Sequence, residues 1–97
     1  MNDLLALVKQ SLAIVSTATT RDTELIALIN AGIEDLKRQG IDTEIENKDL
    51  INATIIMFVK ANFGMIDEKQ KEYAQKSYIS LCHNLSLSGE YKEALDD

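Results

Sequence analysis

The stretch that most constrains the fold is Asp49–Phe63, DLINATIIMFVKANF, because its middle is too uniformly apolar for an amphipathic surface helix. A helix through Ile55–Val59 would be apolar on every side and would have to lie inside something. The run is shorter than the roughly 20 apolar residues of a membrane span, and Asn52, Lys60 and Asn62 flank it closely. We therefore expect the buried central helix of a soluble domain, covered by its own chain alone or partly by other subunits.

Length and composition indicate one globular domain. The chain has 97 residues, which suffices for one modest hydrophobic core but not for two. Its 45% hydrophobic and 27% charged residues are typical of a folded protein rather than a disordered one. The absence of proline suits a mostly helical chain. We expect an all-α fold.

Apolar residues at three- and four-residue spacing predict further helices before and after the central one. The result is a small single-domain bundle of about four helices, at approximately 3–15, 22–39, 48–63 and 67–85. In the first helix, Val15 would lie on the apolar stripe and Lys9 would face water. Residues 1–85 would form the helical domain. The acidic tail 86–97 has too few apolar residues to fold alone, so it would be extended or would order only on a partner.

Particular side chains are expected to begin these helices or to pack them together. Asp22 or Thr20 would accept a hydrogen bond from the amides that open the second helix, Asn47 would cap the central helix, and Asp67 would cap the last. Gly32 lies in the middle of the second helix, where it costs about 1 kcal/mol relative to alanine. We interpret it as a site of close packing against a neighbouring helix.

The charge of the chain limits its partners. A net charge of −6 and a pI near 4.7 argue against a protein that binds nucleic acid by neutralising phosphates, which needs clustered Lys and Arg. An acidic surface would repel a duplex and let it slide past. Cys82 is the only cysteine, so we expect no disulfide within the chain, and the amino terminus lacks the pattern of a secretion signal. These features predict a protein of the reducing cytoplasm.

Patterns of catalysis and cofactor binding are not matched. Cys82 and His83 are adjacent, so on a helix they point about 100° apart, and no second histidine completes a metal site. The acidic segment Asp42–Ala53 lacks the glycine and the final glutamate of a calcium loop. An acyl carrier would need a serine within Arg21–Leu25, and a DNA-binding helix-turn-helix would need exposed basic residues. We expect no enzyme, no cofactor and no metal.

Two stretches carry a family pattern. One is DTELIALINAGIEDL in the second predicted helix, with marked positions at Asp22, Glu24, Leu25, Ile29, Ile33 and Leu36. The other closes the last helix, with Tyr78, Leu81, Leu85, Ser88 and Tyr91. Together with the order of the helices, they make nearly the whole chain resemble the small head-tail connector proteins of tailed bacteriophages. Such proteins are often called DNA-packaging proteins, and occur in phages and prophages of Gram-positive bacteria.

The resemblance implies a structural protein of the virion neck, at the head-tail junction, that is located in the host cytoplasm before assembly. Copies of the chain would form a ring beneath the portal protein. The ring would continue the channel through which double-stranded DNA passes without sequence-specific binding, and would offer a docking surface to the stopper or tail-completion protein. The carboxy-terminal segment 86–97 would be the part that reaches the portal. No membrane is expected among the partners.

Candidate interface residues are large apolar or aromatic side chains in the last two helices and the tail. They are Phe58, Phe63, Tyr73, Tyr78, Leu87, Tyr91 and Leu95. The sequence leaves open whether Phe58 lies in the core of the monomer or against a neighbouring subunit. It also leaves an alternative function: a small helical regulatory or adaptor module that binds a single protein partner through the last helix and the tail.

Overall fold

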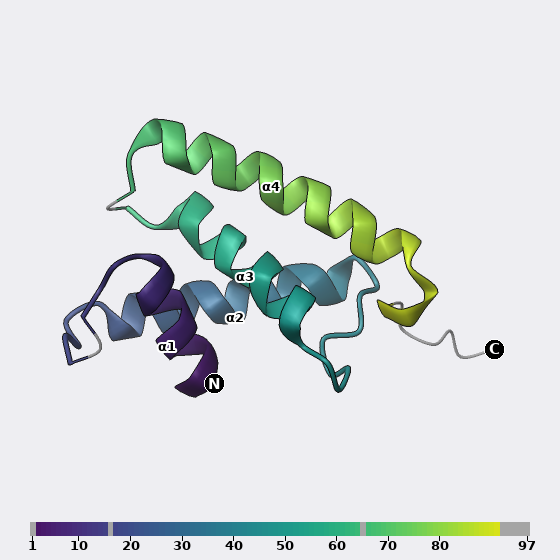
Figure 1. Ribbon diagram of the computed structural model, residues 1–97, viewed down its shortest axis with the longest axis horizontal. Helices are drawn as coiled ribbons and strands as arrows, with labels where there is room; N and C mark the ends of the chain where they lie inside the picture. The colour runs from purple at the N-terminus through teal and green to yellow at the C-terminus, as the bar shows by residue number, and fades with distance from the viewer. Residues whose placement is uncertain (1, 16, 65, 92–97) are drawn as a thin grey trace.

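The four expected helices are present in the computed structural model, which describes residues 2–15, 17–64 and 66–91 (Figure 1). In chain order they are α1 (Asn2–Ser11), α2 (Asp22–Arg38), α3 (Asp49–Asn62) and α4 (Glu68–Leu87), followed by a short 3-10 helix, η1 (Gly89–Tyr91). The all-α fold class and the four-helix bundle predicted from the sequence are confirmed.

Helix α3 lies in the middle of the molecule, as its apolar sequence requires. It packs against α1, α2 and α4, and in Figure 1 α4 runs antiparallel along one side of it while α1 and α2 lie on the other. No residue from Leu50 to Ala61 is exposed. The chain itself therefore covers every side of its central helix at least in part.

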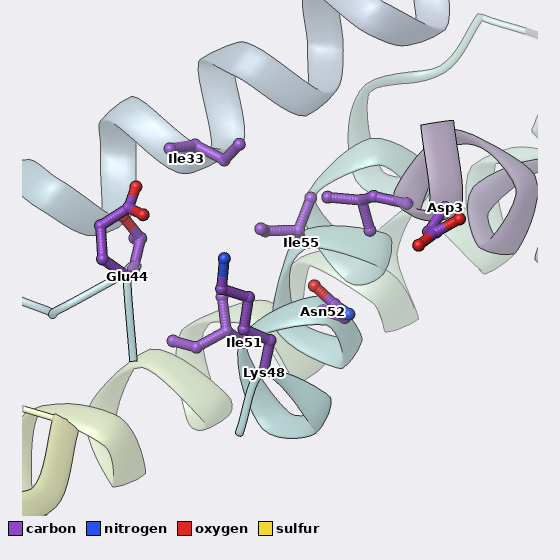
Figure 2. A pocket seen from close by; sticks show the side chains of 9 residues that line it. Asp3, Ile33, Glu44, Lys48, Ile51, Asn52 and Ile55 are labelled. Carbon is purple, nitrogen blue, oxygen red and sulfur yellow. The ribbon is translucent and has the colours of Figure 1, made fainter. Parts of the chain in front are cut away.

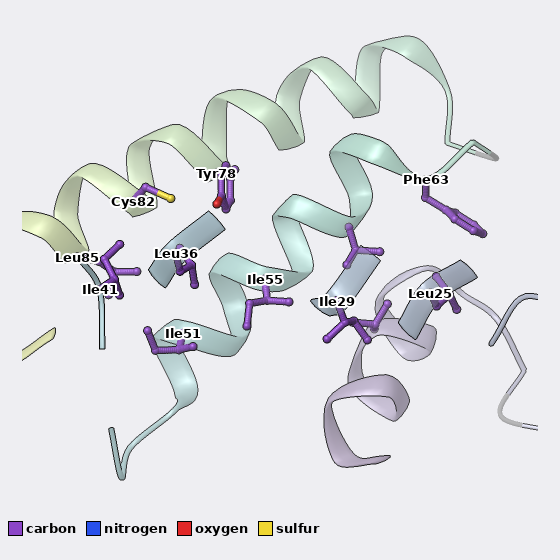
Figure 3. Close-up of a cluster of buried hydrophobic side chains, with 12 residues drawn as sticks. Leu25, Ile29, Leu36, Ile41, Ile51, Ile55, Phe63, Tyr78, Cys82 and Leu85 are labelled. Atoms are coloured by element: carbon purple, nitrogen blue, oxygen red, sulfur yellow. The ribbon is translucent and has the colours of Figure 1, made fainter. Parts of the chain in front are cut away.

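The hydrophobic core joins α3 to all three of its neighbours (Figure 3). In α2 the apolar residues Leu25, Ile29 and Leu36 are fully buried, so they form the side of the helix that faces the core. Thr54 is a buried polar residue of α3, and its hydroxyl is satisfied by donating to the carbonyl of Leu50 at 2.7 Å. The buried hydrophobic residues of the core cluster are Val8, Leu25, Ile29, Leu36, Ile41, Ile51, Ile55, Val59, Phe63, Tyr78, Cys82 and Leu85.

Close packing at Gly32, predicted from its place in mid-helix, is confirmed. A Cβ atom at Gly32 would lie 3.1 Å from Cδ1 of Phe58, closer than ordinary van der Waals contact. The missing side chain therefore lets the Phe58 ring lie directly on the backbone of α2. The opposite side of the contact is supplied by Tyr78, whose ring packs edge-on against Phe58 with centroids 5.3 Å apart. One aromatic ring thus joins α2, α3 and α4.

The first helix ends earlier than predicted, at Ser11 rather than at Val15. The reason is a left-handed residue, Ala13, with φ of 59°. With the backbone turned there, the amide of Ile14 donates to the carbonyl of Lys9 at 2.8 Å, which closes the helix as a Schellman motif does. Val15, which the periodicity placed on the apolar stripe, is exposed beyond this turn.

Lys9 is buried rather than facing water, which corrects the prediction. Only 5% of the residue is exposed, and its ammonium lies 2.7 Å from the carboxylate of Asp22 at the start of α2. Asp22 does not cap α2, because it is the first residue of the helix itself; the cap position belongs to Arg21, and no side chain there accepts a hydrogen bond from the helix. The ion pair instead ties α1 to the first turn of α2.

The other two predicted helix starts are closer to the structure. Asp67 caps α4 as expected, since its carboxylate accepts a hydrogen bond from the amide of Gln70 at 2.9 Å. At α3 the cap position is Lys48 rather than Asn47, but the side-chain oxygen of Asn47 still accepts from the amide of Asp49 at 3.1 Å. Both side chains therefore satisfy backbone amides that a helix start leaves without partners.

The end of α4 leads back to the loop that follows α2. The helix continues two residues beyond the predicted end, to Leu87, and η1 then brings Tyr91 against the core. The carbonyl of Tyr91 accepts a hydrogen bond from the amide of Asp42 at 2.7 Å. Tyr91, the last residue that the structure describes, therefore lies beside the acidic 41–49 loop.

Candidate functional site

The Cys82–His83 pair has no catalytic geometry. Cys82 is buried against α2 while His83 is exposed, so the two side chains point in different directions. Burial raises the pKa of the Cys82 thiol, which disfavours the nucleophilic thiolate. Across the residues that the structure describes, no group of three or more His, Cys, Asp or Glu side chains could hold a metal ion. None of the described helices has the length and apolarity to span a bilayer.

A polar network connects the second half of α4 to the end of α2. The hydroxyl of Tyr78 donates to the carboxylate of Asp35, and the side-chain amide of Gln39 donates to the same carboxylate at 3.0 Å. The amide nitrogen of Gln39 also lies 3.7 Å from Sγ of Cys82. Burial and the neighbouring carboxylate raise the pKa of Tyr78 far above its ordinary value. The network fixes how α4 lies on α2, and we assign it a structural role.

Three of the predicted interface residues lie inside the monomer. Phe63 and Tyr78 are only 2% and 6% exposed, so in this conformation their side chains are core residues rather than an open surface. Phe58 is half-buried between Gly32 and Tyr78. Aromatic residues at helical spacing serve a core or an interface equally well, and in the monomer the side chains of Phe63 and Tyr78 belong to the hydrophobic core.

The remaining predicted interface residues reach the surface or lie beyond the description. Tyr73 and Leu87 are 70% and 71% exposed on the outward side of α4. Tyr91 is half-buried in η1, and Leu95 lies outside the residues that the structure describes. The two exposed side chains are 14 residues apart on one helix, about 21 Å, so they belong to different parts of the surface.

Tyr73 forms one wall of a shallow hollow between α3 and α4. Met57 and Ala74 contribute apolar surface, and the ammonium-bearing side chains of Lys60 and Lys69 also line it, together with Gln70. We call this set the lysine hollow. Tyr73 is among the predicted interface residues but neither lysine is, because Lys60 and Lys69 lie on different helices and come together only where α3 and α4 form an antiparallel pair.

A second hollow, of about 290 Å³, lies between α1, the end of α2, the 41–49 loop and α3 (Figure 2). Its floor is apolar, with Ile51 and Ile55 of α3, and Figure 2 shows Glu44, Lys48 and Asn52 around it. Thr43 also lines it: the residue is 7% exposed, and no hydrogen-bond partner for its hydroxyl is present among the described groups. No sequence signal marked this hollow.

The comparison with known protein families gives one result. A family model described as phage connector protein matches residues 4–92. The match includes all four helices except the first residues of α1. No curated protein and no solved structure matches the chain significantly.

Proposed function

The chain belongs to the phage connector protein family, and from this membership we propose that it forms a ring beneath the portal, at the neck of the virion. The family is structural rather than catalytic, and it associates with other head and tail proteins. The observation that carries the proposal is the family match over residues 4–92, which agrees with the resemblance seen in the second helix and in the closing segment. Origin from a phage of Gram-positive bacteria stays a prediction.

The surface of the monomer supports a role in assembly. Large apolar side chains are exposed on α1, on the segment that follows it and along α4, and they are Leu7, Val15, Tyr73, Ile79 and Leu87. Exposed apolar residues alone are common on soluble proteins. In a family whose members join other virion proteins, however, these positions are the natural sources of apolar contact area.

The charge of the chain supports its proposed place along the DNA channel. A net charge of −6 gives the ring an acidic average surface, which does not neutralise phosphates and so does not hold a duplex that must pass. The expected interaction with double-stranded DNA is therefore passage without sequence-specific binding. The opposite surface of the ring would receive the stopper or tail-completion protein.

The carboxy-terminal segment is proposed to reach the portal. Tyr91 precedes residues 92–97, and its carbonyl is held by the hydrogen bond from the amide of Asp42. Two deletions, of residues 92–97 and of residues 89–97, separate binding to the portal from folding of the chain. Removal of residues 92–97 keeps the Tyr91 contact and should abolish capture by immobilised cognate portal while leaving the thermal melt unchanged. Portal capture that survives deletion of both 92–97 and 89–97 would overturn this assignment.

Ring formation is tested by sedimentation velocity over a concentration series, with the chain alone and with its cognate portal. We expect a discrete assembly of many subunits in at least one of the two conditions. A chain that stays monomeric in both, yet binds one other protein through α4 and the tail, would instead fit the alternative function of a small helical adaptor.

A further inference from the structure

The two ends of the molecule carry opposite charge. The 41–49 loop holds four acidic residues and one lysine: Asp42, Glu44, Glu46, Lys48 and Asp49. The segment 60–76 holds four lysines and three acidic residues: Lys60, Asp67, Glu68, Lys69, Lys71, Glu72 and Lys76. In Figure 1 the loop before α3 and the turn between α3 and α4 lie at opposite ends of the fold. The loop therefore carries a formal charge of −3 (one lysine, four acidic residues), and the segment 60–76 one of +1 (four lysines, three acidic residues).

At the basic end, the lysine hollow has the composition of a contact surface. Lys60 and Lys69 line it, no acidic residue does, and the Tyr73 ring stands 70% exposed beside Met57. An exposed tyrosine next to apolar surface is a common anchor of protein interfaces. The flanking ammonium groups favour a partner that brings carboxylates.

We propose that neighbouring subunits of the ring meet head to tail, with the acidic 41–49 loop of one copy seated on the lysine hollow of the next. The proposal rests on the ring function proposed above and assigns its contact surfaces. Tyr73 and Met57 supply the apolar contact area. The complementary charges set the orientation of one subunit on the next and the choice of partner, because charge complementarity at interfaces contributes more to specificity than to affinity.

The loop that occupies the hollow belongs to a second copy, because a chain's own loop is too far away. Helix α4 has 20 residues, about 30 Å, and the hollow lies at its beginning while the 41–49 loop lies near its end. Two different surfaces of the same molecule meet in such a contact. A heterologous contact of this kind repeats from copy to copy and gives a closed ring when the rotation per subunit closes.

Charge reversal tests the contact. The variant Lys60→Glu with Lys69→Glu makes the hollow acidic, and the variant Glu44→Lys with Glu46→Lys makes the loop basic. Each alone should weaken assembly at least about tenfold in subunit concentration, because like charges would face each other. The matched control for the hollow variant is Lys37→Glu with Arg38→Glu in the last turn of α2, which makes the same change in net charge outside the hollow and should leave assembly unchanged.

Mixing the two reversed variants gives the decisive result. In a 1:1 mixture each acidic hollow can accept a basic loop and each basic hollow an acidic loop, so assembly should return, which also proves that both variants are folded. Assembly of either single variant at the wild-type concentration, or failure of the mixture to assemble, would overturn the head-to-tail contact and leave the ring itself standing. A wild-type chain that is monomeric alone and with portal would overturn both.

Discussion

The contact between Gly32 and Phe58 makes a prediction about how two substitutions depend on each other. Alanine at Gly32 should stabilise α2 by about 1 kcal/mol through helix propensity alone. In the wild-type chain this gain is lost, because the new Cβ would lie 3.1 Å from Cδ1 and 3.3 Å from Cγ of Phe58. The ring has little room to retreat, since Tyr78 packs against it with centroids 5.3 Å apart.

The expected magnitudes follow from these contacts. Overpacking costs about 1 to 3 kcal/mol, so Gly32→Ala should be neutral to destabilising by about 2 kcal/mol in the wild-type chain. Phe58→Ala removes a half-buried ring and should cost about 3 kcal/mol, a large part of the stability of a small domain. In the Phe58→Ala background, Gly32→Ala should stabilise by about 1 kcal/mol, which is a coupling of about 1 to 3 kcal/mol.

Urea unfolding followed by circular dichroism measures all four corners of this cycle. Ala31→Gly is the matched control: it lies on the exposed side of α2 next to Gly32, and should cost about 1 kcal/mol with or without the Phe58 ring. An effect of Gly32→Ala that is the same in both backgrounds would refute the packing argument. A loss well under 1 kcal/mol for Phe58→Ala would indicate that this ring belongs to a subunit contact instead.

Three further predictions concern single features of the fold. Ala13→Gly should stabilise by up to about 1 kcal/mol in urea unfolding because it relieves the left-handed backbone, and Gly40→Ala, at φ of 76°, should destabilise by a similar amount. Effects of the same sign at both positions would contradict this. Lys9→Ala should cost about 2 kcal/mol by leaving Asp22 without its buried partner, and an unchanged melting temperature would refute the importance of the pair. Because the pKa of Tyr78 is raised, the folded state keeps a proton that the unfolded state loses above about pH 10. The free energy of unfolding should therefore fall as the pH rises beyond 10, and Tyr78→Phe should make this fall less steep.

The helices and the central place of α3 were predictable from the sequence because they follow from local periodicity. Five consecutive apolar residues leave a helix no polar side, so α3 had to be surrounded. Gly32 was likewise informative, since glycine in mid-helix is costly without a close neighbour. These features depend on residues near one another in the chain.

The errors came from contacts between distant residues and from a turn that carries no glycine. Lys9 was assigned to water because a lysine is usually solvated, but its burial depends on Asp22 across a helix-helix contact. The end of α1 was missed because the left-handed position is occupied by Ala13 rather than by the glycine that usually marks such a turn. The burial of Phe63 and Tyr78 in the monomer was not predictable either, because a core and an interface use the same aromatic spacing.

The surfaces available to partners were only partly predictable. Tyr73 and Leu87 were named from the sequence and are exposed, but the lysines beside Tyr73 come from two helices and carry no shared motif. The connector function came from resemblance and from the family match, whereas composition and periodicity by themselves indicated only a small acidic helical domain.

The central claim is that this chain is a ring-forming connector, and the most direct test is to measure the mass of the complex that it makes with its cognate portal. Mass photometry of the purified portal with a molar excess of the chain should give a discrete complex that holds one ring of the chain per portal. A portal whose mass does not change, with a chain that remains monomeric at every concentration, would contradict the account.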